Sequence, residues 1–199
     1  MGRRRRRFIG FAVVTVLAGS VALIPAALAA ELTDRQGDTV DDGTGKPMDV
    51  PEADILKSWI SADANGILVG MQVRKPTDPS AHPAWVDGDT IAEWDLDVNG
   101  DSKPDYTVEF SNDDGKVTGE VSRADAADEA PALCSASKLS YKAQEGYTVT
   151  IDPVCVGSPS SVAYQASFTY DTNPSAENST DAADDCPDEG MSPPVARKT

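Results

Sequence analysis

The chain has 199 residues, with 17 basic and 33 acidic side chains, a formal net charge of −16 at pH 7 and one histidine. Such an acidic surface repels nucleic acid and anionic lipid and attracts cations, so the composition argues against nucleic-acid and membrane-surface binding. A single imidazole and the absence of a cysteine cluster also argue against a zinc site.

Residues 1–29 have the three-part pattern of a secretory signal. Five arginines, Arg3 to Arg7, precede an apolar run from Phe8 to Ile24 and the small-residue site Ala27 to Ala29. This order predicts export and cleavage before Ala30. A retained membrane anchor is the alternative, but the run is marginal for the ~20 residues of a membrane span. The arginines followed by Phe-Ile resemble a twin-arginine signal, and an ordinary basic segment looks the same, so the export route stays open.

Removal of the predicted signal leaves 12 basic and 33 acidic residues, a net charge of −21 over 170 residues. The three cysteines Cys134, Cys155 and Cys186 remain in this exported chain, where disulfides are permitted. Cys134 and Cys155 lie inside the predicted folded part and form the predicted pair. Cys186 is then left over, either free or joined to a second chain.

Composition divides the exported chain into three parts. Residues 30–50 are rich in Gly, Asp and Thr and predict an irregular acidic lead-in. Residues 51–170 are long enough for one domain with a real core. Residues 171–199 almost lack large apolar side chains, so burial cannot offset the entropy of ordering and a disordered acidic tail is expected.

The middle part consists of short runs with alternating apolar residues, separated by turn signals. Asn65-Gly66 joins the first two runs, because this dipeptide favours a tight hairpin. About eight strands are expected, within residues 54–76, 90–98, 105–111, 116–122, 138–143, 146–154 and 161–170. Even spacing of strands, without a long amphipathic helix or βαβ rhythm, predicts an all-β, antiparallel, jelly-roll-like β-sandwich.

One run, DLDVNGDSKPDY, collects oxygen-bearing side chains between two of these strands. Calcium prefers six to eight hard oxygen ligands, and alternate residues of a tight loop can direct such groups to one point. An EF-hand frame starting at Asp95 places Asp97, Asn99 and Gly100 correctly but has Tyr106 where a bidentate glutamate is needed. Strands rather than helices also flank the run, so this frame is disfavoured.

A second frame starts at Asp97 and resembles the calcium loop of integrin-type FG-GAP repeats, D-x-N-x-D-x-x-x-D. The predicted ligands are the side chains of Asp97, Asn99, Asp101 and Asp105 and the carbonyl of Lys103. The chain has one copy of the motif, so the resemblance implies the loop but not the propeller that such repeats build. Asp95 lies outside the frame, as an outer ligand or facing water. The alternative is a solvated acidic hairpin without metal.

The wider chain resembles a loosely defined set of uncharacterised secreted proteins of actinobacteria, over about residues 37–170. The shared features are GDTVDD followed by PEADILKSWISADANGILVGMQV, the central loop, and a cysteine followed by YTVTIDPVCVGSPSSVAYQASF. This resemblance implies a jelly-roll-like sandwich and supports the pair Cys134–Cys155. It implies no activity.

No reaction is evident in the sequence. His82 is the only imidazole, and its Pro-rich setting lacks a nucleophile elbow and oxyanion glycines. We therefore expect a secreted, non-catalytic, calcium-stabilised sandwich whose partner is an unknown protein or polysaccharide. The alternative is a carbohydrate-binding module or an accessory to an exported enzyme. Candidate sugar platforms are Trp85, Tyr141, Tyr147 and Tyr164, with Trp85 expected at the surface and Trp59 in the core.

Overall fold

The structure is a computed structural model that describes residues 29–127, 130–175 and 180–198. The predicted signal peptide, apart from Ala29, lies outside the described residues. Ala29 belongs to the first strand and pairs with Ser61, so the predicted cleavage before Ala30 would keep the rest of that strand.

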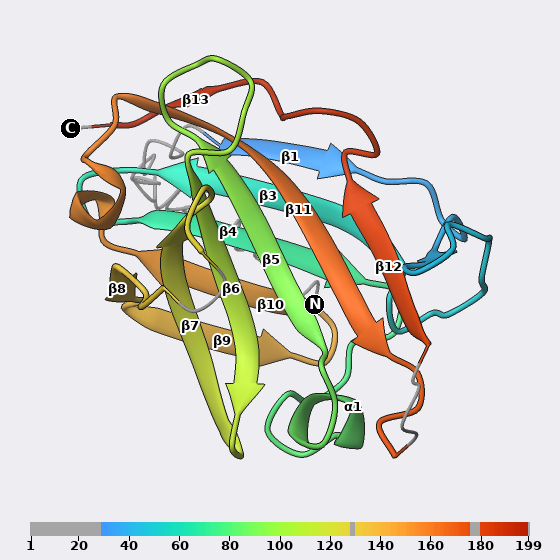
Figure 1. Ribbon diagram of the computed structural model, residues 1–199. Helices are drawn as coiled ribbons and strands as arrows, with labels where there is room; N and C mark the ends of the chain where they lie inside the picture. Colours follow the sequence, from blue (N-terminus) through green and yellow to red (C-terminus); the bar gives the residue numbers. More distant parts are fainter. Residues whose placement is uncertain (1–28, 128–129, 176–179, 199) are drawn as a thin grey trace, which may run out of the picture.

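Two antiparallel sheets pack face to face, and the strands of one run across those of the other (Figure 1). The five-stranded sheet has the order β1 (Ala29–Thr33), β3 (Ile55–Ala62), β4 (Ile67–Val73), β10 (Gly146–Ile151) and β9 (Lys138–Lys142). The eight-stranded sheet has the order β2 (Val40–Asp41), β12 (Asp181–Cys186), β11 (Ser161–Asp171), β5 (Ile91–Asp97), β6 (Tyr106–Asp113), β7 (Lys116–Arg123) and β8 (Cys134–Ser135), with β13 (Val195–Ala196) paired to β11. The predicted antiparallel β-sandwich is therefore confirmed.

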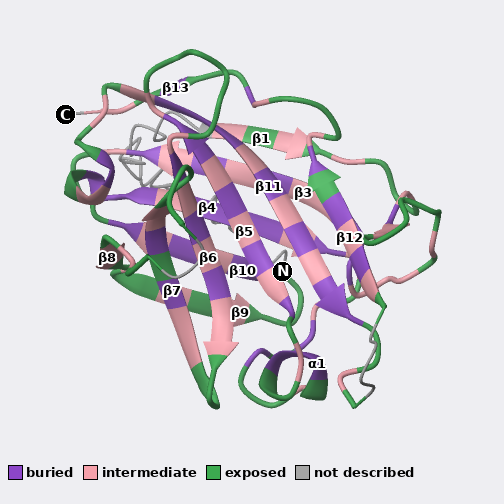
Figure 2. Ribbon diagram, viewed as in Figure 1, coloured by how far each residue is buried: buried purple, intermediate pink, exposed green. Residues whose placement is uncertain are grey.

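Period-two alternation of apolar side chains explains why these runs are strands. In β4, Ile67, Val69, Met71 and Val73 are fully buried between the sheets, whereas Gln72 is half exposed on the outer side. Buried residues likewise recur along β3, β5, β6, β10 and β11 (Figure 2). Successive side chains of a strand point to opposite faces, so this pattern also fixes the register.

The eight expected runs all form strands, and five further strands were not expected from the sequence. Two of these, β1 and β2, occupy the predicted irregular lead-in, which is therefore wrong as a description of residues 30–50. β1 pairs with β3 over five residues and β2 pairs with the edge of β12. Both strands are ordered by backbone hydrogen bonding to a neighbouring strand. Amino-acid composition gives no indication of such pairing.

The predicted disordered tail is also wrong for most of residues 171–199. β12 pairs with β11 over six residues, and its alternate residues Ala182, Asp184 and Cys186 are buried. Further along, the Ser192 amide donates to the Tyr164 carbonyl at 2.7 Å, and β13 follows. Small side chains suffice here because β12 gains its order from backbone pairing with β11 and β2.

Cys186 is a free and buried thiol, which is one of the two outcomes expected for the cysteine left over by the predicted pair. Its Sγ lies 3.0 Å from the Ser58 hydroxyl, and Ser58 Oγ is in turn 3.1 Å from the Tyr164 hydroxyl. Burial raises the pKa of the Cys186 thiol to about 11. A buried, protonated thiol is a poor nucleophile, so Cys186 is not disposed to join a second chain.

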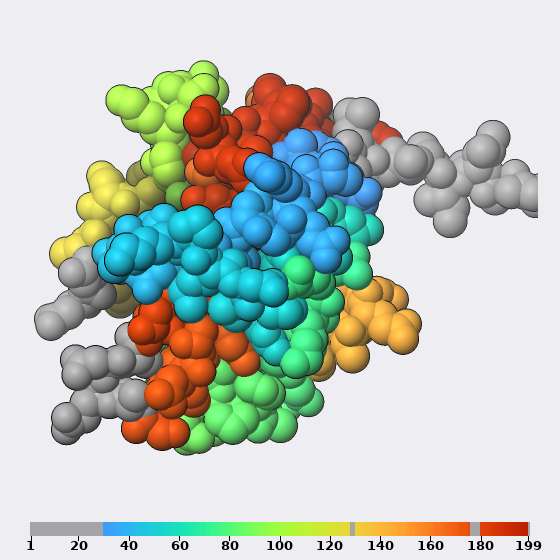
Figure 3. Space-filling view, turned by 90° about the vertical axis from the view of Figure 1, so that its right-hand side faces the viewer, coloured from blue at the N-terminus to red at the C-terminus, as the bar shows by residue number. Residues whose placement is uncertain are grey.

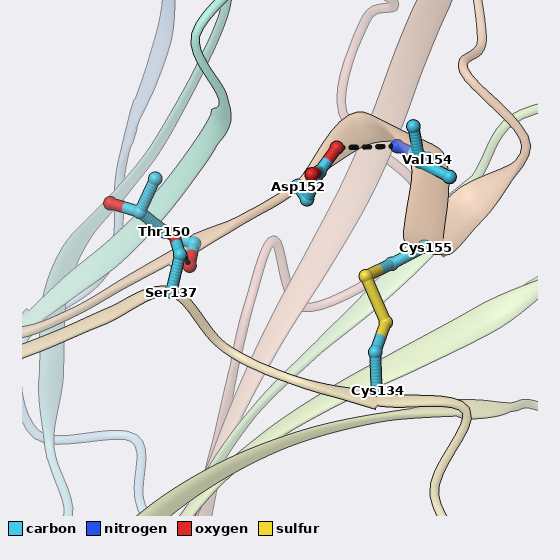
Figure 4. The surroundings of a disulfide bond; sticks show 6 residues. All are labelled: Cys134, Ser137, Thr150, Asp152, Val154 and Cys155. Carbon is cyan, nitrogen blue, oxygen red and sulfur yellow. Dashed lines mark hydrogen bonds between the residues drawn. A yellow bond between two sulfur atoms is a disulfide. The ribbon is translucent and has the colours of Figure 1, made fainter.

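The predicted disulfide Cys134–Cys155 is confirmed (Figure 4). It ties β8 to a short 3-10 helix, η1 (Pro153–Val156), with 6.2 Å between the two Cα atoms. Asp152 begins that helix by accepting a hydrogen bond from the Val154 amide at 2.9 Å. The disulfide thereby joins β8, at the edge of the eight-stranded sheet, to the segment that follows β10 of the five-stranded sheet.

Trp85 is fully buried, which corrects its expected surface position. It lies on the single turn α1 (Pro83–Val86), at one end of the sandwich (Figure 1). Its ring packs against Phe110, Tyr147 and Phe168, with centroid separations of 5.2 to 5.7 Å. Its indole N–H donates to Thr77 Oγ1 at 2.9 Å, so the polar edge of the ring is satisfied in the core.

The ordered position of β12 gives a direct test. Replacement of fully buried Ala182 by lysine places an unpaired ammonium between the sheets and should destabilise the protein by more than ~3 kcal/mol. The neighbouring Ala183→Lys change is the matched control, because Ala183 is half exposed on the outer face, and its effect should stay within ~0.5 kcal/mol. Urea unfolding measures both variants, and equal stabilities would contradict the assignment of β12.

Candidate metal centre

The predicted calcium loop, residues 97–105, joins β5 to β6 and projects from one end of the sandwich (Figure 1). Leu96 and Tyr106 pair across the base of the loop, and both are buried. The Asp105 amide donates to the Leu96 carbonyl at 2.8 Å, which closes the hairpin. The strands therefore hold Asp97 at the start of the loop and Asp105 at its end.

The carboxylate of Asp97 organises the loop from within. Its Oδ1 accepts hydrogen bonds from the amides of Asn99 at 3.0 Å and Gly100 at 2.6 Å, and its Oδ2 accepts one from the Ser102 amide at 2.8 Å. Only 4% of Asp97 is exposed. The chain turns sharply around this carboxylate, with positive φ angles of 83° at Gly100 and 63° at Ser102.

Asp105 and Asn99 form the second contact within the loop. Asp105 Oδ2 accepts from the Val98 amide at 2.9 Å and the Asn99 amide at 3.2 Å, while Asp105 Oδ1 accepts from Asn99 Nδ2 at 2.8 Å. Asn99 Oδ1 accepts from the Asp101 amide at 2.9 Å. The side chains of Asn99 and Asp105 are thereby bonded to each other, and that of Asn99 also to the backbone of Asp101.

The other predicted ligands are more exposed or stand apart. Asp101 is exposed, and its Oδ1 accepts a hydrogen bond from the Lys103 amide at 3.0 Å. Asp95 lies on β5 outside the loop, where its Oδ1 accepts from the Thr107 hydroxyl at 2.8 Å. Burial raises the pKa of Asp95, against the opposing effect of the Thr107 hydrogen bond.

The loop side chains thus surround one turn, but their carboxylates do not form a tight group. Within the described part of the chain, acidic side chains come together in threes at two places, with oxygens within 4.8 Å of one another, and neither includes a loop residue. The carboxylates of Asp97, Asp101 and Asp105 each bind backbone amides through some of their lone pairs and keep others. They would have to turn inward to share a cation.

The sequence reasoning missed a second collection of carboxylates, formed by Asp34, Asp38, Asp54, Asp184 and Asp188. We call these five residues the acidic centre. They come from parts of the chain up to about 150 positions apart, so no spacing pattern could reveal them. The alternation of Ala182, Asp184 and Cys186 in the tail was the one available signal, because it is the pattern of a half-buried strand.

The aromatic residues predicted as sugar platforms are mostly in the core. Trp85, Tyr147 and Tyr164 are fully buried, and half-buried Tyr141 stacks on Tyr147 at 5.5 Å. Trp59, expected in the core, is instead half exposed on the outer face of the five-stranded sheet. Its ring covers Gly70 so closely that a Cβ added there would lie 2.4 Å from Trp59 Cε2.

Comparisons of the chain with protein-family models, with curated proteins and with solved structures found no match. Across residues 29–127, 130–175 and 180–198, the structure contains no helix with the length and apolar character needed to cross a membrane. The class of protein is thus defined by its own features: an antiparallel β-sandwich with one disulfide and two concentrations of carboxylates.

The loop contacts predict unequal effects of two substitutions in calcium-free protein. Asp97→Ala leaves three loop amides without their acceptor and should destabilise the fold by ~1–3 kcal/mol. Asp101→Ala removes one exposed contact and should change stability by less than ~0.5 kcal/mol. Chemical unfolding in the presence of chelator compares the two, and a larger effect of Asp101→Ala would contradict the observed loop geometry.

Proposed function

We propose that this protein is an exported, non-catalytic β-sandwich stabilised by calcium bound in the loop 97–105. The observation that carries the proposal is the arrangement of Asp97, Asn99 and Asp105, which two paired strands hold around a single turn. The ligand set is made of carboxylate and amide oxygens, as calcium prefers, with Asp101 and the Lys103 carbonyl completing it. Three carboxylates bring a charge of −3, which one Ca²⁺ nearly balances.

Export is supported by two independent features. Residues 1–29 have the charged, apolar and small-residue order of a signal peptide. The Cys134–Cys155 disulfide belongs to an oxidising compartment, where such bonds persist. We therefore assign the exported chain to the extracellular space, without a membrane or nucleic-acid partner because its net charge is strongly negative.

The assignment as non-catalytic rests on the role of the only histidine. His82 caps α1, where its Nδ1 accepts a hydrogen bond from the Ala84 amide at 3.3 Å. An imidazole used in this way is committed to local structure.

The burial of Trp85, Tyr147 and Tyr164 favours a protein partner over a polysaccharide, because sugar binding needs exposed aromatic faces.

Trp59 favours carbohydrate binding as a second candidate function. Its indole lies across Gly70 on the outer sheet face, and a hollow beside it is lined by Glu31, Lys57, Gln72 and Gln144. An exposed indole can stack on a sugar ring, and such polar neighbours can bind hydroxyl groups. The Lys57 ammonium lies 5.5 Å from the ring centroid and would have to move aside for a sugar.

Calcium should act on the loop amides as well as on stability. Binding to the folded state alone stabilises it by about 2.7 kcal/mol at a hundredfold excess over Kd, so the melting temperature should rise with calcium and fall with chelator. The amide NMR signals of Gly100 and Ser102 should shift saturably, because their partner Asp97 is a predicted ligand. Asp101→Ala should remove these shifts, and Asp95→Ala should keep them. Unchanged loop signals in the wild-type protein would disprove the loop site.

The carbohydrate alternative predicts retention on insoluble polysaccharides that depends on Trp59. Trp59→Ala should abolish the retention because it removes the exposed indole, whereas Leu133→Ala should preserve it. Leu133 is the control because it is a large apolar side chain, 52% exposed, that lies elsewhere on the surface. Pull-down on cellulose, chitin and xylan measures the retained fraction, and equal retention of both variants would exclude Trp59 as the platform.

A further inference from the structure

The acidic centre brings together three segments that are distant in sequence. Asp34 and Asp38 lie between β1 and β2, Asp54 directly precedes β3, and Asp184 and Asp188 lie on and just after β12. Their oxygens form two overlapping groups within 4.8 Å, one of Asp34, Asp184 and Asp188 and the other of Asp38, Asp54 and Asp184. Asp184 belongs to both. The N-terminal segment and the segment near the C-terminus lie against each other on this side of the molecule (Figure 3).

Asp54 supplies the observation that distinguishes this centre from an ordinary cluster of surface acids. Its side chain is fully buried, and its Oδ2 accepts a hydrogen bond from the Gly37 amide at 3.0 Å. Its Oδ1 is also buried but has no hydrogen-bond partner among the described residues. Burial of a carboxylate oxygen without a partner is strongly unfavourable, and a bound cation would offset this cost.

Two further carboxylates repeat this pattern around Asp54. Asp34 Oδ2 and Asp38 Oδ1 are likewise buried without a hydrogen-bond partner in the described part of the chain. Asp184 is 6% exposed, and its two oxygens accept from the amides of Ile55 at 2.7 Å and Asp185 at 3.0 Å. Unsatisfied acceptors from two segments, the loop after β1 and the residue before β3, therefore lie close to Asp184 of β12.

The protein provides little positive charge to balance the five carboxylates. Arg74 Nε lies 3.2 Å from Asp54 Oδ2, but the same guanidinium also pairs with Asp49 at the surface. Arg35 lines the adjoining hollow together with Asp38, Asp184 and Asp188. Burial, reinforced by neighbouring carboxylates, raises the pKa of Asp184 to about 8 and that of Asp34 to about 7. Arg74 and Arg35 are therefore the only basic side chains that these contacts place beside the five carboxylates.

We propose that the acidic centre is a second calcium site, separate from the loop 97–105, with Asp34, Asp38, Asp54, Asp184 and Asp188 as its ligands. The donor set consists of oxygen atoms, which suits a hard cation and not zinc or copper. Calcium accepts six to eight oxygens in irregular arrangements, whereas magnesium requires a near-ideal octahedron and retains water. A Ca²⁺ ion here joins the segment after β1, the start of β3 and β12, and so fastens the C-terminal part of the chain to the rest.

Calorimetric titration of the exported chain with calcium chloride tests this site, with the loop site removed by Asp101→Ala. The Asp101→Ala protein should still bind one equivalent of Ca²⁺. Adding Asp188→Asn or Asp34→Asn should weaken that binding by roughly tenfold or more, because each removes a charged ligand. Glu189→Gln is the matched control, since it removes the same charge from the exposed neighbour of Asp188 and should leave the affinity unchanged.

Asp54→Asn should have the largest effect on affinity, but its buried contacts also support the fold. Asp188 is exposed and Asp34 only half buried, so their variants keep the test decisive if Asp54→Asn fails to fold. Absence of calcium binding by the Asp101→Ala protein would overturn the proposal, as would equal effects of Asp188→Asn and Glu189→Gln. One equivalent bound by wild type, kept in Asp101→Ala and lost in Asp188→Asn, would support this centre and refute the loop site.

Discussion

The hydrogen bond from the Ile55 amide to Asp184 Oδ2 joins the two sheets, and both of these residues are buried. It connects β12 of the eight-stranded sheet to the first residue of β3 in the five-stranded sheet. A carboxylate in this position fixes how the sheets meet, but it carries a charge into a region with little water. The surrounding aspartates increase that cost, so this side of the sandwich depends on how the negative charge is compensated.

At the α1 end, the sandwich is closed by a network that needs no charge. The Tyr147 hydroxyl donates to the Thr77 carbonyl and accepts from the Thr77 amide, both at 2.9 Å, and Thr77 Oγ1 accepts from the Trp85 indole. The stacked rings of Tyr147 and Phe168 lie beneath Trp85. The Tyr147 hydroxyl and the Trp85 indole N–H thus both have hydrogen-bond partners. The cluster can therefore be both buried and fixed in orientation.

The C-terminal segment links the two proposed calcium sites. It leaves the acidic centre at Asp188, and Met191, Ser192 and Pro194 then lie beside Asp97 and Gly100 of the loop. Ser192 anchors this course through its amide, bonded to the Tyr164 carbonyl, and its hydroxyl, which accepts from the Tyr164 amide at 3.0 Å. A change in the position of this segment would therefore alter the surroundings of both proposed sites.

Local pattern alone determined the eight predicted strands, the loop between β5 and β6 and the pairing of Cys134 with Cys155, because apolar alternation, turn residues and cysteine position act over short distances. Tertiary structure decided the rest. β12 is ordered because β11 offers it a backbone ladder, Trp85 is buried because α1 folds over the sheet ends, and Trp59 is outward because of its register opposite Gly70. The acidic centre exists only in the folded chain, since just the packing of β12 against β3 brings Asp54 and Asp184 together.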